Sequence, residues 1–178
     1  PRNQQGSTCV GWAGAYAAMS TQFNYLYDIT DVNEKDAFAF DPYFLFHQIK
    51  GDNNFNCENG TSMLDALIAM RDYGVKRQLL PAHLVCENAM ATDLYNKSLE
   101  YAKAFRIKDA LIFDLEGAET AETMKYAITQ GFPIMIGTNI TEQMEIDSRA
   151  KYGMGVGLWE PNAAYKDKLG GHAMCIVG

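Results

Sequence analysis

The residues from Val10 to Tyr27 form an apolar run that can be accommodated only inside a fold. Large and small apolar side chains recur through it at helical spacing, on more than one side of the helix. A helix of that kind is covered on several sides by other elements. Gly11 and Gly14 lower its helix propensity by about 1 kcal/mol each relative to alanine, which indicates close packing there. We therefore predict a buried helix over residues 10–27.

Helix-start and helix-stop signals recur through the rest of the first half. Asp41 before Pro42 is typical of a helix start, and Ser62 followed by Asp65 resembles a capping box. Gly74 is placed to end the helix that follows Ser62. The expected elements are a polar link over 28–36, a short helix from 41–42 through 50, and a helix over 63–73.

The second half is richer in strand patterns. Two further helices are expected, but β-branched, aromatic and glycine-rich runs lie around them. The whole predicts an α+β chain, with a mainly helical half over about 1–90, a mainly sheet half over about 91–178, and a cleft between them. We treat residues 1–178 as one domain. The elements expected are helices over 93–105 and 121–130 and strand-like runs over 107–113, 132–138, 152–159 and 172–178.

Charge and composition exclude several kinds of partner. The formal charge is -7 and the 15 basic residues are scattered, which argues against a nucleic-acid partner. No run approaches the roughly 18 to 20 apolar residues of a membrane span. The four cysteines match no zinc spacing, so we expect neither a metal nor another cofactor. The sequence starts at Pro1 without a leader, so we expect any signal peptide or propeptide to be removed or left out.

Two residues combine as a candidate nucleophile and base. Cys9 comes immediately before the buried helix, where first-turn N–H groups and the helix dipole favour a thiolate. A histidine is the preferred base for such a thiol. Among the three histidines, His47 and His83 are expected to be solvated or satisfied, whereas His172 opens an apolar strand. Cys9 and His172 are therefore candidates, and what selects them as a catalytic pair is the sequence around each of them.

The segments around these two residues, RNQQGSTCVGWAGAYA and GGHAMCIVG, resemble those of papain-like cysteine peptidases. That family places a glutamine and a glycine-containing turn before the nucleophile, then a small residue and an aromatic, here Gly11 and Trp12. The Cys-Val-Gly-Trp form resembles bacterial members. The resemblance implies a papain-like fold, with a helical half and an antiparallel β-sheet or barrel half, and a peptidase that works through a thioacyl intermediate.

The spacing before Cys9 departs from the family pattern. The family's glutamine stands six residues before the cysteine, whereas Gln4 stands five before Cys9. Aligning Gln5 and Trp12 with the family's glutamine and tryptophan would put Gly11 at the nucleophile position and predict an inactive enzyme. We prefer the alignment that keeps Cys9, with one loop residue deleted. It implies Gln4 as the oxyanion donor, with Gln5 as the substitute.

The resemblance also extends to the middle of the chain, where it implies a substrate-binding wall. Gly60 corresponds to the backbone position that pairs with an extended peptide, and Gly171 and Ala173 line the opposite wall. Trp159 is expected in the core or at the cleft rim. The pocket for the second residue before the cut is implied to be apolar and built from Thr61, Ser62, Met63, Ile136 and Ala173.

The remaining expectations concern compartment, cysteines and alternatives. The protein is expected to be secreted, periplasmic or at the cell surface and to act on a protein or peptide. Cys57 pairs with Cys86 if the environment is oxidising, or both are free thiols; Cys175 is expected in the core. The Asn that orients the imidazole, in an Asn-Ser-Trp-Gly segment, is expected beyond Gly178.

Two alternatives to an active papain-like peptidase stay open. One is an inactive homologue that binds peptides, and the other is a Cys-His amidase of another fold.

Overall fold

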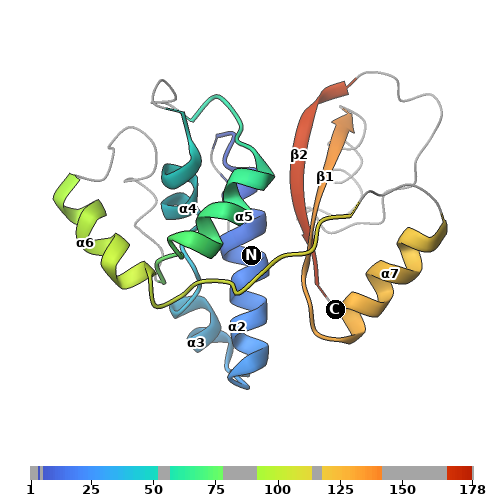
Figure 1. Ribbon diagram of the computed structural model, residues 1–178, viewed down its shortest axis with the longest axis horizontal. Coiled ribbons are helices and arrows are strands. Elements are labelled where there is room, and N and C mark those ends of the chain that lie inside the picture. Colours follow the sequence, from blue (N-terminus) through green and yellow to red (C-terminus); the bar gives the residue numbers. More distant parts are fainter. Residues whose placement is uncertain are drawn as a thin grey trace.

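The described part of the chain forms a layer of helices beside a two-stranded antiparallel sheet, with one helix beyond the strands (Figure 1). The computed structural model describes residues 4, 6–51, 57–77, 92–113, 118–141 and 168–177. The α+β prediction is confirmed. The elements are α1 (Cys9–Gly11), η1 (Trp12–Met19), α2 (Ser20–Leu26), α3 (Val32–Ala37), α4 (Pro42–Ile49), α5 (Met63–Asp72), α6 (Thr92–Ala102), α7 (Ala118–Thr129), β1 (Ile134–Thr141) and β2 (Lys168–Ile176).

The first three elements follow one another without a break. The predicted helix is therefore present, and its buried residues lie between Cys9 and Ser20, whereas Tyr25, Leu26 and Tyr27 are each 66% exposed, so the prediction of burial is wrong for its end. Its middle part, η1, is a π-helix, which the sequence did not indicate. Ser20 stands at the end of the π-helix, where its hydroxyl donates a hydrogen bond to the carbonyl of Ala15 (3.3 Å). The same hydroxyl accepts the N–H of Phe40 (2.9 Å). Ser20 thus ties the widened helix to the segment that leads into α4.

The two glycines of this helix permit the close packing that the sequence predicted. A Cβ atom on Gly11 would lie 2.2 Å from the carbonyl oxygen of Pro42 in α4. A Cβ atom on Gly14 would lie 3.1 Å from side-chain atoms of both Leu45 and Met70. The backbone contact at Gly11 is available only to a residue without a side chain, whereas the neighbours of Gly14 are ends of side chains.

The expected helix boundaries of α4 and α5 are confirmed. The buried carboxylate of Asp41 accepts the N–H groups of Tyr43 (2.9 Å) and Phe44 (3.2 Å) at the start of α4. The hydroxyl of Ser62 accepts the N–H of Asp65 (3.2 Å) at the start of α5. Gly74, with φ of +79°, follows the end of α5.

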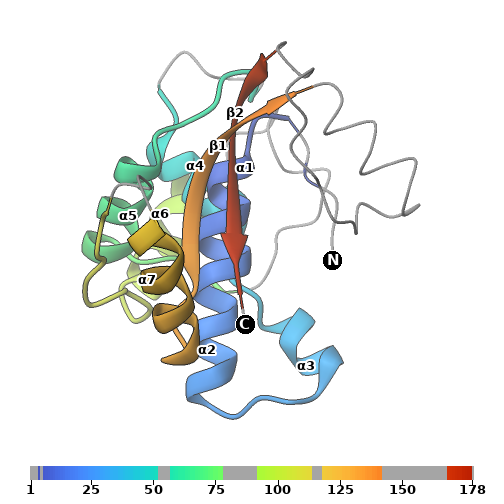
Figure 2. The same ribbon diagram turned by 90° about the vertical axis from the view of Figure 1, so that its right-hand side faces the viewer.

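The prediction of a polar link over residues 28–36 is wrong, because α3 begins at Val32. Its start is stabilised by Asp31, whose carboxylate accepts the N–H of Glu34 (2.9 Å). No residue of α3 is buried, and the helix projects from the end of α2 (Figure 2). A helix that covers no core needs no apolar face, so its sequence shows no apolar periodicity. The Asp31 and Glu34 spacing was the available signal.

Helix α6 packs against the helical layer, so this layer extends past the division expected near residue 91. Ala102 at its end is fully buried in the helical core, and the N–H of Val75 donates to the carbonyl of Phe105 (3.0 Å). Whether the chain is one domain stays a prediction.

The expected strand over residues 107–113 does not form within the described part of the chain. Ile107 is held there, because its side chain packs on the core and its N–H donates to Met70 (3.2 Å). Farther along, Leu111 is 91% exposed and Ile112 is 69% exposed, and no described strand pairs with them. β-Branched and apolar residues favour a strand only where a partner strand is available.

Arg77 joins three parts of the helical layer. Its guanidinium lies 4.2 Å from the ring centroid of Phe23, 4.7 Å from that of Phe38 and 5.5 Å from that of Phe105. It also donates a hydrogen bond to the carbonyl of Phe38 (3.1 Å). These contacts hold the end of the central helix, the end of α3 and the segment after α6 together.

The two strands pair in a register that decides which residues face the helices. Gly137 lies opposite Ala173 and Thr138 lies opposite His172. Met135, Ala173 and Cys175 belong to or pack on the core cluster, so this face of the sheet covers the central helix. Figure 2 shows both strands running alongside that helix. Among the described helices, none is long and apolar enough to cross a membrane.

Replacing Gly11 with alanine should destabilise the fold by about 3 kcal/mol, because α4 must move to admit the Cβ atom. Gly51→Ala is the control, since nothing lies within 4 Å of the added Cβ there. Urea unfolding of the two variants measures the difference. Equal stabilities would contradict the close contact between the helices.

Candidate active site

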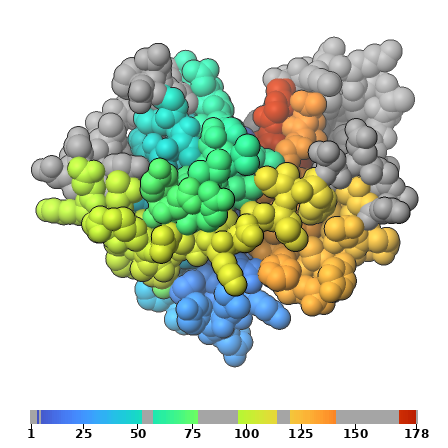
Figure 3. Space-filling view, viewed as in Figure 1, coloured from blue at the N-terminus to red at the C-terminus, as the bar shows by residue number. Residues whose placement is uncertain are grey.

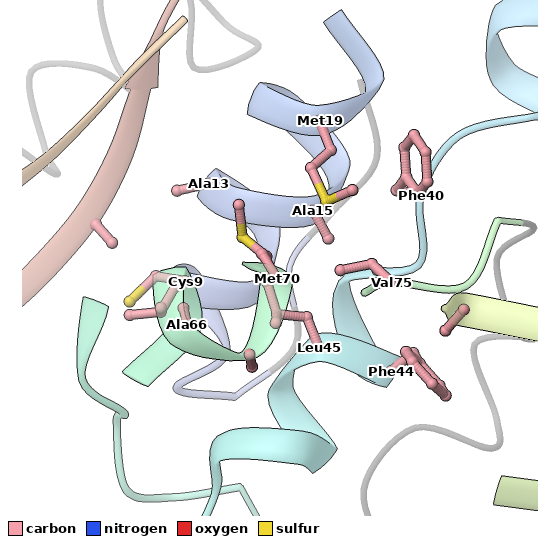
Figure 4. Close-up of a cluster of buried hydrophobic side chains, with 14 residues drawn as sticks. Cys9, Ala13, Ala15, Met19, Phe40, Phe44, Leu45, Ala66, Met70 and Val75 are labelled. Atoms are coloured by element: carbon pink, nitrogen blue, oxygen red, sulfur yellow. The ribbon is translucent and has the colours of Figure 1, made fainter. Parts of the chain in front are cut away.

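Cys9 is the first residue of the central helix and lies at the edge of the hydrophobic core. It is 8% exposed and belongs to the buried cluster around Leu45, Ala66 and Met70. Figure 4 shows it on the side of the cluster that faces β2, away from Phe44. Within the core cluster, Cys9 therefore lies next to the sheet layer.

His172 reaches Cys9 from the sheet layer. It lies in β2, directly opposite Thr138 of β1. Its imidazole and the thiol of Cys9 are joined by a side-chain hydrogen bond. The fold thus brings the two predicted residues together from opposite layers.

The surroundings favour the charged forms of both groups. Burial raises the pKa of the Cys9 thiol, but hydrogen bonds from His172 and from the backbone N–H groups of Ala173 and Val10 outweigh burial and lower it. The hydrogen bond to Cys9 raises the pKa of His172, and burial opposes this only in part. A thiolate next to an imidazolium is the arrangement that both shifts promote.

The turn before Cys9 is held against the segment around Cys57. The N–H of Ser7 donates to the carbonyl of Cys57 (2.8 Å), and its hydroxyl donates to the carbonyl of Glu58 (2.7 Å). Gly6 has φ of +62°, and a Cβ atom there would lie 2.9 Å from the Cys57 oxygen. The approach therefore requires glycine at this position.

Cys57 is disulfide-bonded, whereas Cys9 and Cys175 are free. The alternative that Cys57 is a free thiol is therefore wrong. Cys86 lies outside the described residues, so its pairing with Cys57 stays a prediction. Burial raises the pKa of Cys175 to about 11, in agreement with its expected place in the core.

Gln4 uses one amide hydrogen within its own turn. Its side-chain nitrogen donates to the carbonyl of Gly6 (2.9 Å). The amide carries a second hydrogen, which is the one that an oxyanion would need. Gln5 lies outside the described residues, so the choice between Gln4 and Gln5 as oxyanion donor stays a prediction.

The molecular surface is hollowed between α5 and the two strands (Figure 3). Gly60 precedes α5, Gly171 lies in β2, and both are exposed, with nothing within 4 Å of an added Cβ atom. Backbone at either place is therefore open to an extended ligand. The hydroxyl of Ser62 already caps α5, whereas that of Thr61 is buried without a hydrogen-bond partner.

Ile136 does not lie with the other residues expected in the substrate pocket. It pairs with Met174, one position along from the pair of Gly137 and Ala173, so its side chain points to the opposite face of the sheet from Ala173. Gly137 stands beside Ala173 instead, and a Cβ atom on it would lie 3.5 Å from the sulfur of Met63. A shift of one residue along a strand reverses the face, which sequence alignment alone did not resolve.

Comparison with known proteins agrees with this arrangement. A protein of Acanthamoeba polyphaga mimivirus, described as an uncharacterized peptidase C1-like protein, is 25% identical over 168 residues, which cover 86% of this chain and 50% of that protein. The crystal structure of xylellain, a cysteine protease from Xylella fastidiosa, superposes with a TM-score of 0.60 at 16% identity, over 98% of this chain and 66% of that one. No family model matches.

The chain therefore has the fold of a cysteine protease. The fold match bears out the predicted papain-like architecture and argues against the alternative of a Cys-His amidase with another fold. The chain spans about half the length of its viral relative.

The papain-like alignment that keeps Cys9 as nucleophile agrees with the geometry. Cys9 is hydrogen-bonded to His172, whereas Gly11 packs against α4 and carries no group that can react. His47 lies within α4, and His83 and Trp159 lie outside the described residues. Among the described residues, no cluster of His, Cys, Asp or Glu suits a metal ion.

Replacing His172 with alanine should raise the pKa of the Cys9 thiol, because the largest of the effects that lower it is removed. The measurement is the pH dependence of Cys9 alkylation by iodoacetamide, followed by peptide mass spectrometry. In the parent protein its midpoint should lie below the ordinary thiol value of 9.0, and in the variant it should move upward. An unchanged midpoint would contradict the pairing of Cys9 with His172. Thr138→Ala serves as a control that leaves the imidazole in place.

Proposed function

We propose that the protein is a cysteine peptidase of the papain-like kind, with Cys9 as nucleophile and His172 as general base and acid. The observation that carries this proposal is the hydrogen bond between the two side chains, with the pKa of the thiol lowered and that of the imidazole raised. A buried cysteine with a purely structural role has no need of such a partner. Cys175, whose pKa burial raises, shows the contrast.

The reaction proceeds in two acyl transfers. The Cys9 thiolate attacks the carbonyl carbon of the scissile peptide bond and forms a tetrahedral oxyanion. The carbon–nitrogen bond then breaks while His172 gives its proton to the leaving amine, and a thioester remains on Cys9. In the second transfer, His172 takes a proton from water, the resulting hydroxide attacks the thioester, and the acid and the thiolate are released.

The oxyanion would be held by the backbone N–H of Cys9 and by the amide of Gln4. The second amide hydrogen of Gln4 supports this role. The turn that carries Gln4 and Gly6 is fixed through Ser7 to the backbone of Cys57 and Glu58. A donor held in place before the reaction stabilises developing charge without a reorganisation cost.

The substrate is proposed to be an extended peptide that lies in the hollow between α5 and the strands. Exposed backbone at Gly60 supports pairing with one edge of the peptide, and Gly171 supports a contact on the other side. The side-chain pocket is proposed to be bounded by Thr61, Met63, Ala173 and, in place of Ile136, Gly137. An absent side chain at Gly137 leaves room for a large apolar substrate side chain.

We also propose that the protein works in an oxidising environment. A second part of the proposal is that it resembles bacterial members of the family, as the Cys-Val-Gly-Trp segment suggests. The disulfide at Cys57 supports secretion, a periplasm or a cell surface, since disulfides persist in such environments. An inactive peptide-binding homologue remains the competing hypothesis, but it gives no reason for the paired pKa shifts of Cys9 and His172.

Cys9→Ala should abolish hydrolysis of a fluorogenic peptide and labelling by a thiol-reactive epoxide, because the nucleophile is lost. Cys175→Ala is the matched control and should retain both. Full-length protein is incubated with a mixture of peptides of varied sequence, and cleavage products are identified by mass spectrometry. Intact substrate after prolonged incubation of the parent protein would sink the proposal and favour the inactive homologue.

Gly137→Val should narrow the pocket. We expect kcat/KM to fall by about tenfold or more for peptides with a large apolar side chain at the second position before the cut, and to change little for alanine there. Ile136→Val is the control, because Ile136 points to the opposite face of the sheet. If Ile136→Val altered this preference and Gly137→Val did not, the placement of the pocket would be wrong.

A further inference from the structure

Basic side chains gather in one depression on a chain whose formal charge is -7. The depression has a volume of about 410 Å³. It lies along the segment after α6, which crosses below α5 in Figure 3, whereas the hollow between α5 and the strands opens at the top of that view. Its lining consists of Arg71, Lys103, Ala104, Arg106, Ile107 and Lys108.

The fold places these side chains together for a definite reason. Ile107 packs on the core and is anchored through its N–H to the carbonyl of Met70 (3.2 Å). Arg106 and Lys108, on either side of it, are exposed. Arg71 stands in the last turn of α5 and completes the group. Anchoring of the apolar residue therefore fixes the backbone that carries two cations.

Nearby carboxylates neutralise only part of this charge. Arg71 forms two hydrogen bonds to the carboxylate of Asp72 (2.7 and 3.1 Å), and Lys103 pairs with Glu100 (2.5 Å). After the hydrogen bond from Arg71, the charge of Arg106 also contributes to the lowered pKa of the Asp72 carboxyl, and the charge of Asp109 acts on Arg71. Within the described ranges, no ion pair within 4.0 Å holds Arg106 or Lys108.

The described backbone beside the depression also has N–H groups without a backbone partner. Among the described residues, no backbone hydrogen bond uses the N–H of Arg106 or of Lys108. The carboxylate of Asp109 accepts the N–H of the next residue, Ala110 (2.8 Å). The depression therefore offers the side chains of Arg106 and Lys108, two cations that no ion pair among the described residues holds.

We propose that this depression is a binding site for a phosphate group, separate from the Cys9 site. A guanidinium supplies planar, paired donors to a tetrahedral oxyanion, and an ammonium adds a point charge. The bound anion would also relieve the repulsion between the cations of Arg106 and Lys108, which have no ion-pair partner in the described part of the chain. The site does not depend on the proposed peptidase activity, because none of its lining residues contacts Cys9 or His172 in that proposal.

Titration calorimetry of the full-length protein with inorganic pyrophosphate tests the proposal. The variant Lys103→Gln with Lys108→Gln removes two cations from the site. The control, Lys125→Gln with Lys97→Gln, makes the same change elsewhere, since Lys125 also pairs with a glutamate three residues before it and Lys97 is exposed. We expect the site variant to weaken pyrophosphate affinity by about tenfold and the control to keep it. Thermal unfolding of both variants verifies that they are folded.

Vesicles of phosphatidylcholine with phosphatidic acid distinguish a lipid phosphate from a free one. The proposal is supported if the site variant weakens the binding of pyrophosphate or of these vesicles while the control does not. The probe that is affected then identifies the source of the phosphate. Failure of the parent protein to bind both probes would overturn it. Equal weakening by the site variant and the control would also overturn it, because the attraction would then be general.

Discussion

Coverage of the helix from Cys9 to Ser20 is the constraint on which the arrangement of this molecule depends. An apolar helix gains stability in water only when other elements cover each of its apolar sides. Here α4 contacts it at Gly11, and β1 contacts it through Met135 at Gly14. Helices and strands are therefore forced onto different sides of one helix, and its first turn lies where the two layers meet. The position of Cys9 follows from how the core is packed.

The reactivity of that position follows from the donors around the sulfur. Cys9 and Cys175 are both largely buried, and burial alone raises the pKa of a thiol, as it does for Cys175. At Cys9 the hydrogen bonds from His172 and from two backbone N–H groups reverse the direction. The same low-polarity surroundings then strengthen the attraction between thiolate and imidazolium. The pKa values of the two thiols therefore differ because of the hydrogen-bond donors around each sulfur, and not because of exposure.

The sequence predicted the features that depend on local pattern. The central helix, the starts of α4 and α5, and the meeting of Cys9 with His172 all came from apolar periodicity, caps and a family resemblance. The sequence did not reveal features that depend on contacts with residues elsewhere in the chain. The π-helix depends on the contacts of Ser20, and residues 107–113 lack a described partner strand. Gly137 replaces Ile136 because strand register, which alternates faces at every residue, is set in three dimensions.

Because Cys9 and His172 come from different layers, the distance between their side chains depends on how closely the two layers pack. Cys9 belongs to the central helix and His172 to β2, so a small separation of the layers lengthens the hydrogen bond without disturbing either layer internally. The energy of a hydrogen bond falls steeply with distance, whereas apolar contacts between layers weaken gradually. On heating, Cys9 should therefore lose its partner while the helices are still intact, and its fast alkylation should be lost at a lower temperature than the helical structure.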